Sequence, residues 1–180
     1  MKIRILLLIS FTFLLVSCNK EIIKPKFEYN KKANELIEYI ISQENVDCLL
    51  EIPKKSMIEI DTLESPTFQY VNFYTKRLSI KNKKELDSLN RLSENFVLDE
   101  SILLKRNIKI INRDSLRILN KDVNFQTKIC EDLKYILKPI FNKEYTIAII
   151  EYGYTGMCLS NSKTIYVYKN KKWNKIKDEY

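Results

Sequence analysis

The stretch EYTIAIIEY, residues 144–152, decides how this sequence folds. Its β-branched and aromatic residues are typical of a buried β-strand. A second such run, KTIYVYK, covers residues 163–169, and the pair Asn170-Lys171 after it suits a tight turn because asparagine tolerates positive φ. The segment KWNKIK then completes a hairpin. The C-terminal part of the chain therefore predicts an antiparallel β-meander.

The chain has two glycines, Gly153 and Gly156, and both lie in EYGYTGMC, residues 151–158, between these two strands. Glycine is favoured where the backbone needs positive φ or approaches another backbone closely, so a sharply shaped loop is predicted here. Tyrosines surround this loop, with Trp173 on the following strand. The candidates for an aromatic binding surface are Tyr152, Tyr154, Tyr166 and Tyr168. Two interpretations stay open: these tyrosines form an exposed contact surface, or they are the core face of the meander.

Upstream of the meander, the apolar residues follow a helical period. A helix is predicted over residues 31–44, with Asn30 as its cap. A second helix is predicted over residues 82–96, where Asn82 and Glu85 resemble a capping box. Residues 56–61 alternate as a short strand would, and residues 65–80 fit either a helix or a strand. Two or more helices in the N-terminal half and a C-terminal antiparallel meander predict an α+β fold.

The first twenty residues have a different character. Lys2 and Arg4 precede a run of twelve mostly apolar residues, 5–16. A transmembrane helix needs about 20 residues, so this run is too short to span a bilayer. Its charge, length and position are those of a secretory signal peptide. The sequence Leu15-Val16-Ser17-Cys18 at its end resembles the lipobox of bacterial lipoproteins.

The lipobox resemblance implies cleavage between Ser17 and Cys18 and a diacylglyceryl group on the Cys18 sulfur. Two or three acyl chains hold a protein on a bilayer, so the lipid bilayer is the first expected partner. By the same resemblance, Asn19 implies export to the outer membrane of the cell envelope. The predicted organisation is a signal peptide over residues 1–17, a lipidated tether over residues 18–30, in which Pro25 opposes a helix, and one globular domain over residues 31–180.

The C-terminal part carries a second, shorter resemblance. Residues 138–141, KPIF, then a strand, a cysteine-bearing loop, residues 165–169, IYVYK, and Trp173 resemble the end of small envelope lipoproteins of unassigned function. This resemblance implies a location and no chemistry. Members of that group often carry two cysteines, each followed by glycine, in this loop. Here only Cys158 is present, and Leu159 follows it, so a bridge within the loop is excluded.

Three cysteines remain after Cys18: Cys48, Cys130 and Cys158. An exported chain favours disulfides, and three thiols permit one bridge whose pairing the sequence does not fix. Cys130–Cys158 is the preferred pair, because Cys130 precedes one strand of the meander and Cys158 lies in its glycine-bearing loop.

The composition limits the chemistry. The chain has no histidine, which excludes Ser-His-Asp and Cys-His catalysis and every zinc site that needs imidazole. Its net charge of +8 is spread along the sequence, which predicts a solvated lysine-rich surface and no nucleic-acid partner. No metal or cofactor motif is present.

We therefore expect a non-enzymatic binding or scaffold lipoprotein, with an envelope protein or polymer as its partner. Two alternatives stay open. One is a carboxylate-dependent hydrolase of an envelope polymer, for which the sequence offers the adjacent acid pairs Asp99-Glu100 and Glu131-Asp132. The other is a toxin inhibitor or immunity-type lipoprotein.

Overall fold

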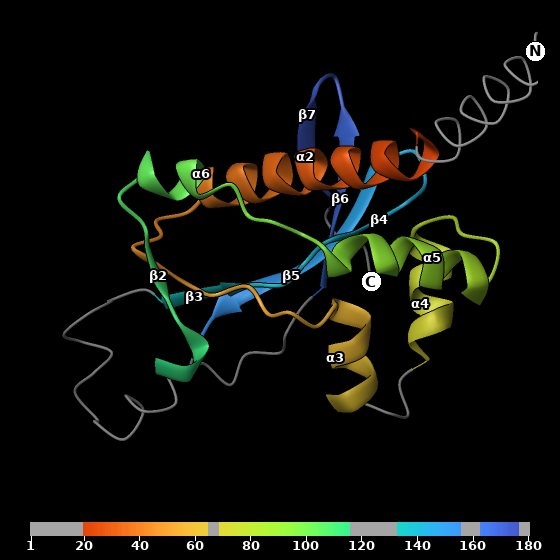
Figure 1. Cartoon of the computed structure of the whole chain (residues 1–180), viewed down its shortest axis with the longest axis horizontal. Coiled ribbons are helices and arrows are strands. Elements are labelled where there is room, and N and C mark those ends of the chain that lie inside the picture. Colours follow the sequence, from red (N-terminus) through yellow and green to blue (C-terminus); the bar gives the residue numbers. More distant parts are fainter. Residues whose placement is uncertain (1–19, 65–68, 116–132, 156–162, 177–180) are drawn as a thin grey trace, which may run out of the picture.

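A mixed β-sheet forms the middle of the molecule. The structure is a computed structural model that describes residues 20–64, 69–115, 133–155 and 163–176 (Figure 1). The strands follow the order β2-β1-β3-β5-β6-β7, and β4 pairs with β5 beside this path. Strand β1 is parallel to β2 and β3, and the other pairs are antiparallel. The strand bounds are β1 (Cys48–Leu50), β2 (Lys109–Ile111), β3 (Leu133–Ile136), β4 (Ile140–Phe141), β5 (Ile147–Tyr154), β6 (Lys163–Lys169) and β7 (Lys172–Lys175).

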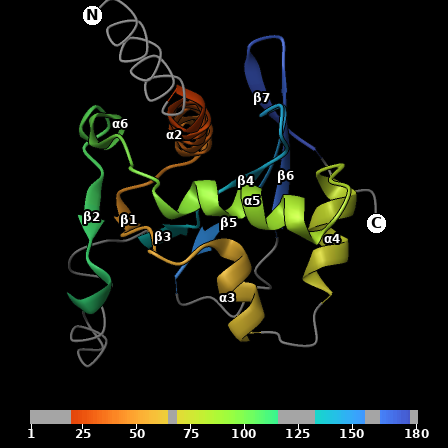
Figure 2. The same cartoon turned by 45° about the vertical axis from the view of Figure 1, so that its right-hand side comes forward.

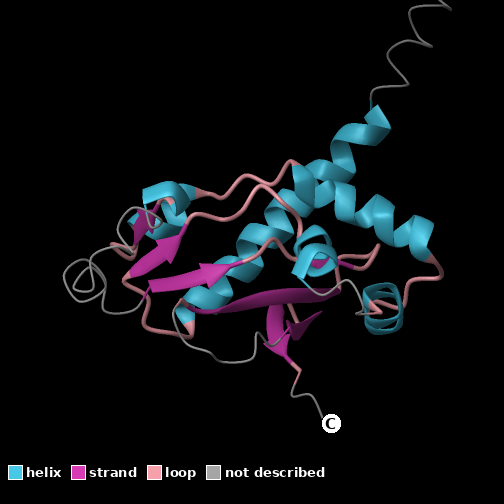
Figure 3. Ribbon diagram, turned by 90° about the horizontal axis from the view of Figure 1, so that it is seen from below, coloured by secondary structure: helices cyan, strands magenta, loops and turns pink. Residues whose placement is uncertain are grey.

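Helices cover both faces of this sheet (Figures 2 and 3). Helix α2 (Lys20–Ser42) and the short α6 (Glu100–Leu104) pack on one face. Helices α3 (Met57–Glu64), α4 (Tyr70–Arg77) and α5 (Lys83–Glu94) contribute to the core on the other face. Helices in the N-terminal half and a mostly antiparallel C-terminal sheet confirm the predicted α+β class.

The C-terminal meander follows from the alternation of its strands. Ala148 and Ile150 of β5 face the core under α2, whereas Ile149 between them faces the core formed with α3, α4 and α5. Strand β5 pairs with β6, and β6 pairs with β7 through the predicted Asn170-Lys171 turn. Both turn residues have left-handed backbone conformations, with φ of 55° and 61°.

Helix α2 confirms the predicted apolar stripe but begins earlier than expected. It runs from Lys20 through Pro25, so the predicted Asn30 cap and the non-helical tether are wrong. A proline removes one backbone hydrogen bond without having to end a helix. Tyr29 is buried, and its hydroxyl donates to the carbonyl oxygen of Pro139 at 2.8 Å. The folded domain therefore begins before residue 31.

The strand predicted over residues 56–61 is wrong, because α3 begins at Met57. Ser56 and Glu59 form a capping box: the Ser56 backbone N–H donates to Glu59 at 2.6 Å, and the Glu59 N–H donates to the Ser56 hydroxyl at 3.2 Å. Helix α4 settles the ambiguous segment in favour of a helix, although residues 65–68 lie outside the described residues. Helix α5 is confirmed, with Asn82 as its cap.

Candidate functional site

A cavity of about 330 Å³ opens beside β1, and we call it the β1 cavity. Its walls come from β1 and the segment after it, from the connection between α5 and α6, and from β2. Most of the lining is apolar: Leu49, Leu50, Ile52, Pro53, Phe96, Val97, Leu98 and Ile110. The polar members are Glu51, Lys54, Glu94, Glu100 and Lys138. An apolar cavity of this size with a few polar groups is the usual form of a small-molecule site.

Two asparagines of α2 fix one wall of the β1 cavity. Asn30 accepts a hydrogen bond from the backbone N–H of Val97 at 3.1 Å. Asn34 donates to the carbonyl of Val97 at 3.0 Å and accepts from the N–H of Asp99 at 2.8 Å. These bonds replace the pairing that a neighbouring strand would provide, so the extended segment 97–99 is held in place on the helix.

Lys138 is the buried cation of the β1 cavity, with only 4% of its surface exposed. Its Nζ donates to the carbonyl oxygen of Lys54 at 2.6 Å and to that of Glu94 at 3.4 Å. Burial lowers the pKa of Lys138, against the charges of Glu59 and Glu94, which raise it. An ammonium has three donors, and within the described part of the chain no carboxylate forms an ion pair with this one. One of the three Nζ–H donors of Lys138 is therefore left for a further acceptor.

A second polar group lies between α3, β5 and β6. The Lys163 ammonium contacts Asp61 at 2.8 Å and Glu151 at 3.3 Å, and both carboxylates are buried. The Tyr74 hydroxyl donates to Asp61 at 2.6 Å. Burial alone would lower the pKa of Lys163, but its bonds and charge interactions with both acids outweigh burial and raise that pKa. We call Asp61, Lys163 and Glu151 the ion cluster.

The four candidate tyrosines do not form one exposed surface. Tyr166 is 2% exposed, its ring packs edge-on against Tyr39 of α2, and its hydroxyl lies 2.8 Å from that of Tyr152. The predicted contact surface is therefore wrong at Tyr166, because alternation along β6 turns this residue toward α2.

The other three tyrosines differ in how much of each side chain is exposed and in what it contacts. Tyr168 is half-buried between Trp173 and the Lys32 ammonium, which lies 3.7 Å from its ring centre. Tyr154 is 39% exposed, and the Lys134 ammonium lies 4.2 Å from its ring centre. Tyr152 is half-buried, so only part of the proposed aromatic surface is available to a partner.

Gly153 has a different role from the predicted one. It lies within β5, opposite Tyr135 of β3, and its φ is not left-handed. A Cβ at this position would lie 3.2 Å from the Tyr135 ring. The glycine therefore makes room for an aromatic side chain and does not shape a turn. Gly156 lies outside the described residues.

The predicted acids and cysteines are only partly within the described residues. Asp99 caps α6, and a hydrogen bond from Ser101 lowers its pKa, whereas Glu100 lines the β1 cavity. Cys48 is buried and disulfide-bonded, so the bridge includes a cysteine that the preferred pair omits. Its partner lies outside the described residues, as do Ser17, Cys18, Cys130, Glu131, Asp132 and Cys158.

Sequence analysis missed Lys138 and the ion cluster. The available signal was a charge inside an apolar strand-like run: Lys138 follows Leu137, and Glu151 follows Ile150. A charged residue in a buried strand needs a partner across the fold, and the sequence does not identify that partner.

Among the described helices, none is both long enough and apolar enough to cross a membrane. The described residues also include no group of three or more acids or cysteines placed to hold a metal ion. No protein-family model, curated protein or solved structure matches this chain.

Proposed function

We propose that this chain is a lipid-anchored protein of a bacterial envelope that works by binding. Its ligand is a small molecule with an apolar body and one anionic group, and it occupies the β1 cavity. The lipobox at residues 15–18 supports the anchor. The observation that carries the ligand class is the buried Lys138 ammonium in the wall of an otherwise mostly apolar cavity.

The chemistry of Lys138 favours an anionic ligand group. Two backbone carbonyls accept from its Nζ, and the charges of Glu59 and Glu94 act on it without forming an ion pair among the described residues. A ligand carboxylate at the third donor would form a charge-assisted hydrogen bond, worth about 1.5–3 kcal/mol. The apolar lining would bind the rest of the ligand through the hydrophobic effect.

The wall held by Asn30 and Asn34 supports binding by a preformed site. Three hydrogen bonds between these side chains and the backbone fix residues 97–99 before any ligand arrives. Ordering a loop on binding costs affinity, and this segment is already ordered.

The ion cluster does not provide the carboxylate pair that the hydrolase alternative needs. A pair of catalytic carboxylates has to flank the bond that is cleaved. Between Asp61 and Glu151 lies the Lys163 ammonium, which contacts both acids. The cluster therefore supports a structural role between α3, β5 and β6. The immunity-type alternative stays a prediction.

Calorimetric titration with octanoate and 1-octanol tests the ligand class. The two probes share an apolar chain, and only octanoate carries a charge that Lys138 can bind. We expect octanoate to bind about tenfold or more tightly than octanol, because a charge-assisted hydrogen bond contributes about 1.5–3 kcal/mol. In Lys138→Met this preference should disappear, while octanol binding is retained.

A second variant tests the cavity without altering the core. Val97 is 68% exposed at the cavity, so Val97→Arg should leave the fold intact and obstruct both probes. The matched control is Leu63→Arg, on α3, where Leu63 is 64% exposed. Equal affinity for the two probes, or full binding in Val97→Arg, would refute the proposed site.

A further inference from the structure

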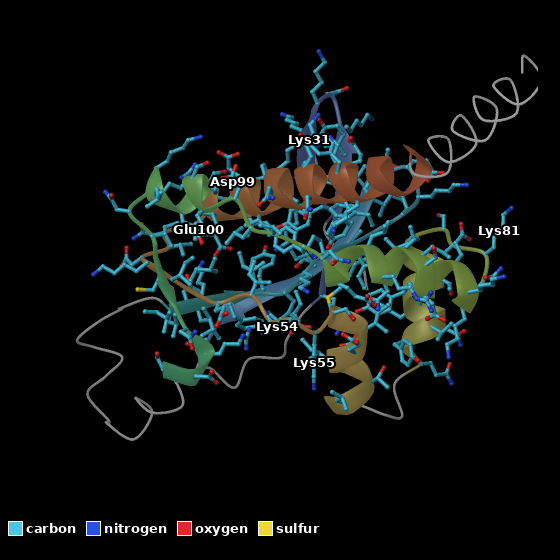
Figure 4. All side chains as sticks on the ribbon, viewed as in Figure 1. Lys31, Lys54, Lys55, Lys81, Asp99 and Glu100 are labelled. Atoms are coloured by element: carbon cyan, nitrogen blue, oxygen red, sulfur yellow. The ribbon has the colours of Figure 1, made fainter. Side chains whose placement is uncertain are left out.

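The N-terminal half of α2 presents an exposed aromatic side chain beside a basic one. Phe27 is 69% exposed, and Lys31, one turn further along, is exposed on the outer side of the helix (Figure 4). Residues at i and i+4 share one face of a helix. A large apolar side chain next to a lysine is the composition of helices that lie on a membrane surface.

Two other elements carry the same kind of residue on the same side of the molecule. Figures 1 and 2 both show the β6–β7 turn, α6 and the start of α2 in the upper part of the molecule. Lys171 of this turn and Lys172, the first residue of β7, line a groove together with Arg106, which follows α6. Leu104 at the end of α6 is 75% exposed. We call Phe27, Lys31, Leu104, Arg106, Lys171 and Lys172 the α2 face.

The charge of the α2 face is positive. The same groove contains Glu35 and Glu38, but Glu35 already pairs with Lys32 at 2.8 Å. Glu38 of the groove and the α6 acids Asp99 and Glu100 supply three further negative charges beside the four cations of the face (Figure 4). Apart from the Lys32–Glu35 pair, the four cations exceed these three acids by one. The two large apolar side chains of the face, Phe27 and Leu104, are exposed with them.

We propose that the α2 face lies against an anionic lipid surface. This inference rests on the proposed lipid anchor, because α2 begins at Lys20, only two residues after Cys18. With an acyl chain at Cys18, almost no spacer would separate the lipid from α2. The domain and its basic side would therefore be held near the headgroups. Lysines near such a surface are attracted to it, and Phe27 and Leu104 can enter the interface.

Quenching by brominated lipids tests this orientation. The acylated protein is purified from membranes and placed in vesicles of brominated phosphatidylglycerol and phosphatidylcholine. The chain has one tryptophan, Trp173, which is 2% exposed and cannot contact lipid directly. We expect Phe27→Trp to add emission that brominated lipid quenches. The control Leu63→Trp, exposed on α3 away from this face, should keep its added emission (Figure 1).

Charge variants of the reporter protein test the electrostatic part. Each lysine near an anionic surface contributes about a fivefold change in docking equilibrium. Lys171→Gln with Lys172→Gln should therefore weaken quenching of Phe27→Trp, and vesicles of phosphatidylcholine alone should do the same. The control pair Lys76→Gln and Lys81→Gln, exposed on or beside α4 and α5, should leave quenching unchanged.

The outcomes separate the inference from the proposed anchor. Anchored protein with equal quenching of Phe27→Trp and Leu63→Trp overturns the α2 face and leaves the anchor standing. Quenching that is insensitive to the Lys171 and Lys172 changes overturns the role of charge. A purified chain with an unacylated N-terminus and no membrane association overturns both the anchor and the orientation that rests on it.

Discussion

At the scale of single residues, Lys163 holds two buried carboxylates in place. Removing one partner of a buried ionic group leaves an uncompensated charge and costs about 3–5 kcal/mol. We therefore expect Lys163→Met to lower the free energy of unfolding by about that amount at pH 7, measured by urea denaturation. Lys169→Met, an exposed position on the same strand, is the control and should change stability by less than about 0.5 kcal/mol.

The same variant has a pH signature. The pKa of Lys163 in the folded protein is raised above its ordinary value of 10.5. A raised pKa gives stability that is fully present below pH 10.5 and is lost as the pH rises through the folded-state pKa. The stability difference between the natural chain and Lys163→Met should therefore shrink above pH 10.5. A difference that stays constant into that range would contradict the ion-pair account.

The role of a residue could be predicted from the sequence where its hydrogen-bond partner lies nearby in the chain. The Asn82 cap was predicted because its partner is the N–H of Glu85, three residues away. The burial of Tyr166 depends on Tyr39, far away in sequence on α2. Lys138 likewise bonds to carbonyls of residues 54 and 94. No local pattern reports such partners, so the β1 cavity was not predicted.

At the scale of elements, the β6–β7 turn contains a residue with an unfavourable backbone conformation. Lys171 has φ of 61°, and a left-handed residue other than glycine costs roughly 1–2 kcal/mol. Turns of this shape favour Asn-Gly, so Lys171→Gly should raise the free energy of unfolding. We expect a gain of about 0.5–1 kcal/mol in urea denaturation, because glycine also gains freedom in the unfolded chain.

The neighbouring strand residue supplies the control for this turn. Lys172→Gly removes the same side chain type from β7, where glycine has no backbone advantage, so it should destabilise the hairpin. Equal effects of the two changes would show that lost charge, and not backbone strain, explains the Lys171 result.

Helices and strands were predicted best where their apolar pattern extends over many residues. The apolar stripe of α2 and the β-branched and aromatic run of β5 were both recognised, because each extends over many residues. The six residues 56–61 fit alternation by chance, and the capping box of Ser56 and Glu59 was the better signal. Strand β1 has three residues, so its existence depends on distant neighbours and not on local pattern.

At the scale of the whole molecule, the bridge at Cys48 ties β1 to a cysteine outside the described residues. If Cys18 is acylated as we propose, one bridge leaves one free thiol among the remaining three cysteines. We expect unfolded, unreduced protein from membranes to contain one reactive thiol, and Cys48 to resist alkylation until reduction. Peptide mapping by mass spectrometry measures both, and it also identifies the partner of Cys48.

The bridge should also contribute to stability. A disulfide typically stabilises a domain by about 2–4 kcal/mol, so reduction should lower the free energy of unfolding within that range. A Cys48 peptide that is alkylated before reduction would instead favour the Cys130–Cys158 pair that sequence reasoning preferred.

The place of β1 in the sheet also bears on the order of folding. Cys48 pairs with Lys109 on one side and with Leu133 on the other, so β1 gains its neighbours only by closing two long loops. The pairs β5–β6 and β6–β7 join strands that are adjacent in sequence, and such local contacts form faster. In a chain translocated from its N-terminus, α2 and β1 would emerge long before the strands they pack against. The apolar stripe of α2 would then stay uncovered for much of that passage, and any factor that shields exported chains would meet it first.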